Sequence, residues 1–216
     1  MADKDGSSFL QIDTEDLELS LSEPQLRKFR KNRAKFADLV NRLIVELGLQ
    51  GLIEHLTVCS PAQCRAVLYR EIGNPWPSKR VCLDIYIDRY MNERLLRHEF
   101  QHEADRRNPE MLYDPAIEER WRNKLWALEA AANISVDARL GKRGLGKEFR
   151  RKEFRQAVRG QHDALFEDTW ANPPRTWSEM EAVAFKLVEF GDEEHPKQCP
   201  VAIRPKRHTR VRRGEE

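Results

Sequence analysis

The pattern most specific for chemistry in this sequence is a histidine pair that brackets a glutamate, in the segment His98-Glu99-Phe100-Gln101-His102. On a helix, positions i and i+4 lie one above the other, so the two imidazoles could direct nitrogen atoms at one metal ion. Glu99 would then lie beside the ion, where a carboxylate can take a proton from a bound water. Neutral imidazoles suit zinc, which lowers the pKa of a bound water toward ~7. The segment therefore predicts zinc-assisted hydrolysis, with His98 and His102 as ligands and Glu99 as the catalytic base.

A catalytic zinc needs a third protein ligand and leaves its fourth position for water. The next long helical pattern offers two carboxylates, Glu129 and Asp137, which are too far apart in sequence for one ion to take both easily. Together with Asn133 they are spaced by four residues and form one polar stripe. The small residues at 130–132 would let this helix approach the histidine helix closely. Either carboxylate is a candidate third ligand.

Asp105 follows His102 by three residues and shares roughly the same helix face. It could accept a hydrogen bond from a ligand imidazole and so fix the tautomer of that ring. It could equally pair with Arg106 or Lys124 on the surface. Both roles are open at this stage.

Hydrophobic periodicity predicts the elements that would position these residues. Ser22 and Pro24 are typical of a helix start, and Asn108-Pro109 of a helix end. Strands are expected at 56–59, 66–72 and 80–87, the last two joined by the turn 73–78 as an antiparallel hairpin. Helices are expected from about residue 24 to 47, 92 to 107, 116 to 140 and 178 to 190.

The His-Glu-x-x-His segment, followed by Glu129-x-x-Ala132-Asn133 on the next long helix, resembles the gluzincin metallopeptidases. Within that clan the order of elements over roughly residues 24 to 140 is most similar to compact ImmA/IrrE-type and minigluzincin-like proteins. The resemblance implies an α+β, zincin-like fold. It would have an N-terminal helix, a small antiparallel sheet, an active-site helix and a second ligand-bearing helix. It also implies Glu129 as the third zinc ligand and Asn133 as a hydrogen-bond partner behind the ligands.

A second resemblance favours the other carboxylate. His98-Glu-x-x-His102-x-x-Asp105, followed by the Asp137-x-Arg139-Leu140 segment, is similar to bacterial HExxH proteins of uncharacterised function. That resemblance implies Asp137 as the third ligand. Of the two implications, Glu129 is the one we expect to hold.

Length and composition bound the domain organisation. The 216 residues suit one domain with extensions, and 38 Lys and Arg against 36 Asp and Glu give a net charge of +2. We expect an acidic flexible tail over 1–22, a zincin-like domain over 23–190 and a basic flexible tail over 191–216. No apolar run approaches the ~18 residues of a membrane span, and the N-terminus lacks a signal-peptide pattern. The expected location is the cytoplasm, without membrane association.

The function predicted from these residues is a zinc metallopeptidase acting on a peptide or protein substrate. The alternative is a regulatory protein that binds DNA or a protein partner and whose zinc site is structural or vestigial. Basic residues crowd 143–159 and 204–213, which makes nucleic-acid binding conceivable, but a balanced net charge does not favour it. An intact Glu99 favours the enzyme, because a structural zinc site has no use for a base there. A metal-dependent hydrolase of a non-peptide substrate is a third reading.

Overall fold

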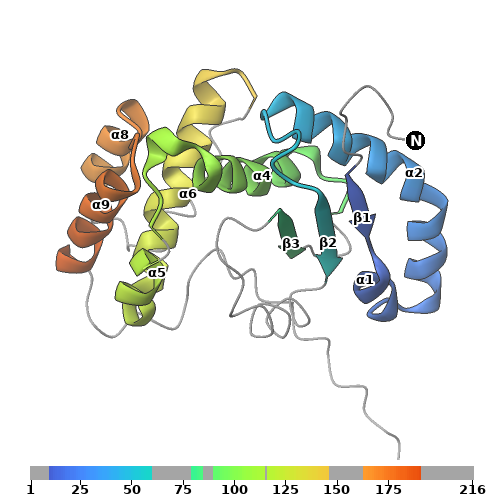
Figure 1. The fold of residues 1–216 in the computed structure, drawn as a ribbon. Helices are drawn as coiled ribbons and strands as arrows, with labels where there is room; N and C mark the ends of the chain where they lie inside the picture. The colour runs from blue at the N-terminus through green and yellow to red at the C-terminus, as the bar shows by residue number, and fades with distance from the viewer. Residues whose placement is uncertain (1–9, 60–78, 85–89, 115, 146–162, 191–216) are drawn as a thin grey trace, which may run out of the picture.

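The computed structural model describes residues 10–59, 79–84, 90–114, 116–145 and 163–190. They form an α+β fold in which a small sheet is outnumbered by helices (Figure 1). Along the chain, the elements are β1 (Gln11–Asp13), α1 (Glu15–Leu19), α2 (Glu23–Glu46), β2 (His55–Cys59), β3 (Arg80–Asp84), α4 (Glu93–Arg107), the 3-10 turn η1 (Pro109–Met111), α5 (Ala116–Arg120), the 3-10 turn η2 (Arg122–Lys124), α6 (Leu125–Lys142), α8 (Asp163–Ala171) and α9 (Trp177–Phe190). No helix in these ranges has both the length and the apolar character that crossing a membrane requires.

The described sheet is parallel, in the order β1-β2-β3. Leu56 of β2 pairs with Ile12 of β1 on one side and with Val81 of β3 on the other. The expected antiparallel sheet is therefore not what these strands form. The proposed hairpin partner of β3, residues 66–72, lies outside the described residues. Alternation of apolar residues sets which face of a strand is buried, but it is the same for either strand direction, so it could not distinguish the two pairings.

The acidic N-terminal segment is part of the fold from residue 10 onward, so the predicted flexible tail over 1–22 is wrong for most of its length. β1 pairs with β2, and Leu17 of α1 is fully buried in the core. Thr14, between β1 and α1, is also buried. The acidic composition of this segment suggested a flexible tail, although a few apolar side chains anchor the segment in the core. Residues 1–9 lie outside the described ranges.

Helix α2 begins as the sequence predicts. The side chain of Gln25 accepts hydrogen bonds from the backbone N–H of Ser22, at 3.0 Å, and from its hydroxyl, at 2.7 Å. Phe29 and Phe36 are buried along one face and pack edge-on against Tyr90. This face belongs to the same hydrophobic cluster as the buried residues of β2, β3 and α4.

Helix α4 carries the His-Glu-x-x-His segment and has well-defined ends. The Asn92 side chain caps its start by accepting from the backbone N–H of Leu95, at 3.1 Å. Its end at Arg107 precedes Asn108-Pro109, as expected, because proline disfavours helical backbone in the residue before it. The sequence prediction for this element is confirmed.

The predicted long helix over 116–140 is divided in the structure into α5, η2 and α6. Trp121 stands at the break, buried, and its indole N–H donates to Glu181 of α9 at 2.8 Å. This contact between distant parts of the chain lies where the helix is interrupted, whereas the hydrophobic periodicity predicted one continuous helix. The helix predicted at 178–190 is confirmed as α9.

Two hydrophobic clusters make up the core. The first joins α1, α2, the sheet and α4, and the second joins η1, α5, α6, α8 and α9. Helices α4 and α6 contact each other between the two clusters (Figure 1). The predicted ligand residues lie on these two helices.

Candidate metal centre

The two histidines of α4 converge. His98 is almost fully buried, His102 is partly buried, and their rings are nearly perpendicular with centroids 4.7 Å apart. Their Nε2 atoms lie 3.1 Å apart. The helical spacing thus produces the arrangement that the sequence predicts for the pair.

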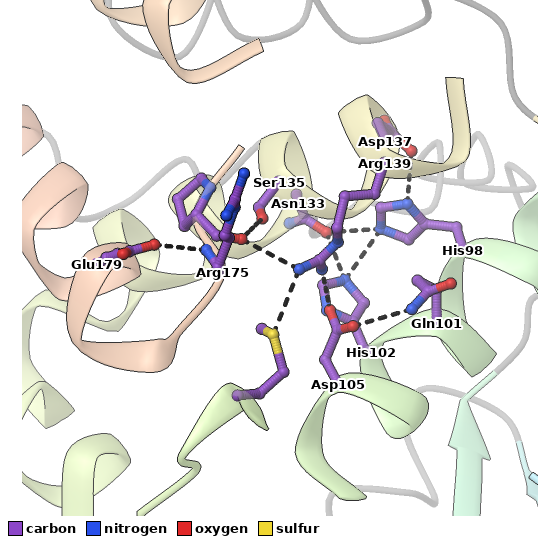
Figure 2. Close-up of polar contacts among 12 residues, drawn as sticks. His98, Gln101, His102, Asp105, Asn133, Ser135, Asp137, Arg139, Arg175 and Glu179 are labelled. Atoms are coloured by element: carbon purple, nitrogen blue, oxygen red, sulfur yellow. Dashed lines mark hydrogen bonds and ion pairs between the residues drawn. The ribbon is translucent and has the colours of Figure 1, made fainter. Parts of the chain in front are cut away.

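Two residues of the polar stripe on helix α6, Asn133 and Asp137, face these imidazoles (Figure 2). The Oδ1 atom of Asn133 lies 2.7 Å from Nε2 of His98 and 3.0 Å from Nε2 of His102. Oδ1 of Asp137 lies 2.7 Å from Nδ1 of His98. The alanines at 130–132 are buried, so small side chains accompany the close approach of the two helices, as expected.

The positions of Asp137 and Asn133 relative to the two imidazoles differ from those expected from the sequence. Asp137 contacts Nδ1 of His98, and this contact orients the ring. Asn133, expected behind the ligands, lies against both Nε2 atoms instead. Glu129 is half-buried one turn before Asn133, and its role as third ligand stays a prediction. Within the described residues, no group of three or more His, Cys, Asp or Glu side chains is placed to hold a metal ion.

Glu99 follows His98 on α4 and is partly exposed. Among the described residues, no hydrogen bond or ion pair engages its carboxylate. A carboxylate that is not committed to a partner, next to a convergent imidazole pair, can accept a proton from a substrate or a water.

Asp105 takes neither of the roles predicted for it. Its buried carboxylate forms an ion pair with Arg139 of α6 and accepts a hydrogen bond from Gln101 at 2.9 Å. Burial raises the pKa of Asp105 above its usual value of 3.8, and the charge of Arg139 acts in the opposite direction. The pair therefore links α4 to α6 one turn beyond the histidines.

Arg139 also joins the site to the second cluster (Figure 2). Its guanidinium donates to the backbone carbonyl of Pro174 at 3.2 Å and contacts Sδ of Met111 at 3.5 Å. Ser135 donates to the same carbonyl at 3.3 Å. The buried carboxylate of Asp105 requires a cation nearby, and Arg139 supplies it.

Arg97 precedes His98 and holds the start of α4 against α2. Its buried guanidinium makes two hydrogen bonds to Glu46, at 2.7 and 3.0 Å, and one to Glu93, at 2.6 Å. Glu93 also binds Arg42 of α2, and the two arginines lower the pKa of Glu93 from 4.5 to about 2. Sequence periodicity gave no sign of the contact between α2 and α4 in this network, since Arg97 and Glu46 are 51 residues apart.

No family model, curated protein or solved structure matches this chain. Any function is therefore inferred from the residues of this chain and from the geometry of α4 and α6.

Proposed function

We propose that this protein is a zinc-dependent hydrolase, and specifically a metallopeptidase. The observation that carries the proposal is the convergence of His98 and His102, whose Nε2 atoms are 3.1 Å apart. Two nitrogen ligands of a tetrahedral zinc at about 2.0–2.1 Å would lie roughly 3.3 Å apart. The pair is thus close to the separation that zinc requires.

The residues around the pair also fit zinc chemically. An ionised carboxylate only accepts hydrogen bonds, so the contact with Asp137 places the proton of His98 on Nδ1. This leaves the lone pair of Nε2 available, which is the tautomer that a metal ligand needs. Zinc, when bound, would supply Lewis acidity toward a water molecule and a substrate carbonyl.

In this proposal Glu99 acts as the general base and then as the general acid. It would accept a proton from water during attack on the carbonyl, and then donate it to the leaving amine. The peptide bond as substrate follows from the resemblance of the His-Glu-x-x-His segment to gluzincins. The same chemistry would serve another acyl substrate, and the substrate screen below separates the two.

Replacement of Glu99 by glutamine tests the proposal. Glu99→Gln keeps the size of the side chain and removes its basicity. Zinc content should therefore stay at the wild-type level while cleavage of a broad peptide library falls by ~10²–10⁴. Zinc content, thermal unfolding and cleavage are measured on the same preparation. Glu110→Gln, an exposed change beyond the end of α4, serves as the matched control and should leave all three unchanged.

Equal cleavage by wild type and Glu99→Gln would contradict the assignment of Glu99. Zinc binding by both, with no cleavage of peptides or ester substrates by either, would favour the regulatory alternative. A salt titration of nucleic-acid binding would then test that alternative directly.

A further inference from the structure

We propose that Asn133 is the third protein ligand of the metal, so that the ion is held by two imidazoles and one amide oxygen. This inference deepens the proposed function and depends on the metal that it invokes. It replaces the carboxylate ligand implied by the sequence resemblance with a neutral one. Three independent features of the described residues support it.

The first feature is the location of protons around His98. Its Nδ1 atom faces the carboxylate of Asp137 at 2.7 Å and must donate there. The Nε2 atom of the neutral ring is then an acceptor, yet it lies 2.7 Å from Oδ1 of Asn133, which is also an acceptor. Two acceptors at this distance repel unless a proton or a metal ion lies between them. A shared metal ion meets this requirement.

The second feature is the geometry of the three atoms. Nε2 of His98, Nε2 of His102 and Oδ1 of Asn133 are separated by 2.7, 3.0 and 3.1 Å. They form a compact triangle of nitrogen and oxygen atoms, small enough for all three to bind one metal ion. One face of that ion would remain for water and substrate.

The third feature is the placement of the two carboxylates on α6. The carboxylate of Asp137 contacts Nδ1 of His98, whereas the triangle includes the other nitrogen of that ring, Nε2. No set of three His, Cys, Asp or Glu side chains within the described ranges is arranged to bind a metal, so Glu129 does not complete such a set with the two imidazoles. Asn133 is only 5 % exposed and lies directly against both Nε2 atoms.

A neutral third ligand has a measurable consequence. With a carboxylate at this position, one charge of the zinc ion would be neutralised by direct contact. With Asn133, the ion keeps its full charge and binds less tightly. A carboxylate placed at residue 133 should therefore strengthen metal binding.

The test is zinc affinity of the full chain, measured by competition with a chromophoric chelator. Asn133→Asp should bind zinc about tenfold tighter than wild type, because it adds a negative charge in contact with the ion. Asn133→Ala should bind it at least ~10-fold more weakly, because a protein ligand is lost. Glu129→Gln removes the rival carboxylate on the same helix stripe and should change the affinity less than ~3-fold.

A second measurement reports on the ligand set without catalysis. The visible absorption spectrum of the cobalt(II)-loaded protein depends on the atoms that bind the ion. Asn133→Asp should shift that spectrum, and Glu129→Gln should leave it unchanged. Thermal unfolding in a chelator shows whether each variant folds. If Asn133→Ala does not fold, the affinity and spectrum of Asn133→Asp decide the question.

Failure of this inference and failure of the proposed function give different results. If wild type binds zinc, Glu129→Gln releases it and Asn133→Asp leaves its affinity and spectrum unchanged, Glu129 is the ligand and the inference is wrong. In that case Asn133 is a hydrogen-bond donor whose amide is turned toward the imidazoles. If wild type takes up no zinc from the chelator, both the inference and the proposed function are overturned.

Discussion

The two imidazoles of the candidate centre differ in burial, because His98 is buried and His102 is only partly buried. Both nitrogens of His98 have contacts. Nδ1 contacts the carboxylate of Asp137, and Nε2 lies against Oδ1 of Asn133 and Nε2 of His102. The tautomer of His98 follows from the carboxylate contact alone. The residue types at 98, 99 and 102 could be read from the sequence, since four-residue spacing on a helix places both rings together.

The ion pair between Asp105 and Arg139 is a residue-scale contact that joins α4 to α6. Arg139→Ala would leave a buried carboxylate without this cation, at a cost of about 3 kcal/mol in the free energy of unfolding. Chemical denaturation at neutral pH measures this loss. Lys31→Ala, which removes an exposed cation on α2, should cost less than about 0.5 kcal/mol and serves as the control.

The same variant should show a characteristic pH dependence. The pKa of Asp105 is already above 3.8 in the folded protein because of burial, and loss of Arg139 raises it further. A folded-state carboxyl with a raised pKa binds its proton more tightly than in the unfolded chain, so its ionisation costs stability as the pH rises. The deficit of Arg139→Ala should therefore shrink as the pH falls from 7 toward about 4. A deficit that is constant or grows over this range would contradict the ion-pair account.

At the scale of elements, the helices could be predicted better than the sheet. The ends of α2 and α4 carry local signals, such as Ser22, Asn92 and Pro109, that act within a few residues. Strand direction depends on pairing between β2 and β3, whose partners are 25 residues apart. The division between α5 and α6 depends on the contact of Trp121 with Glu181, which is likewise distant in sequence. The position of Asn133 against both imidazoles has the same origin, because it depends on how α6 approaches α4.

The N-terminal element β1–α1 provides a prediction at this scale. Leu17 is fully buried in the first cluster, whereas Leu19 in the same helix is 75 % exposed. Leu17→Ala should lower the free energy of unfolding by about 2–4 kcal/mol, because it leaves a cavity in the core. Leu19→Ala should change it by less than about 0.5 kcal/mol. Equal, small effects of the two substitutions would support the flexible tail that the acidic composition suggests.

At the scale of the whole molecule, the candidate centre lies where two hydrophobic clusters meet. Helix α4 belongs to the cluster around the sheet, and α6 belongs to the cluster with α8 and α9 (Figure 1). Arg97 ties α4 to α2, while Arg139 ties α6 to Asp105 and to Pro174. The relative position of the clusters therefore sets the separation between the imidazoles and Asn133, and a bound metal would join the two halves.

The most direct test of the account is the zinc content of the intact chain. The protein is stripped with a chelator, reloaded with zinc, freed of excess metal and analysed by elemental mass spectrometry. Wild type should hold one zinc per chain and His98→Ala essentially none. The control His55→Ala, altered in β2 away from the site, should hold one. A wild-type protein that retains no zinc, or a His98→Ala variant that retains as much as wild type, would contradict the account.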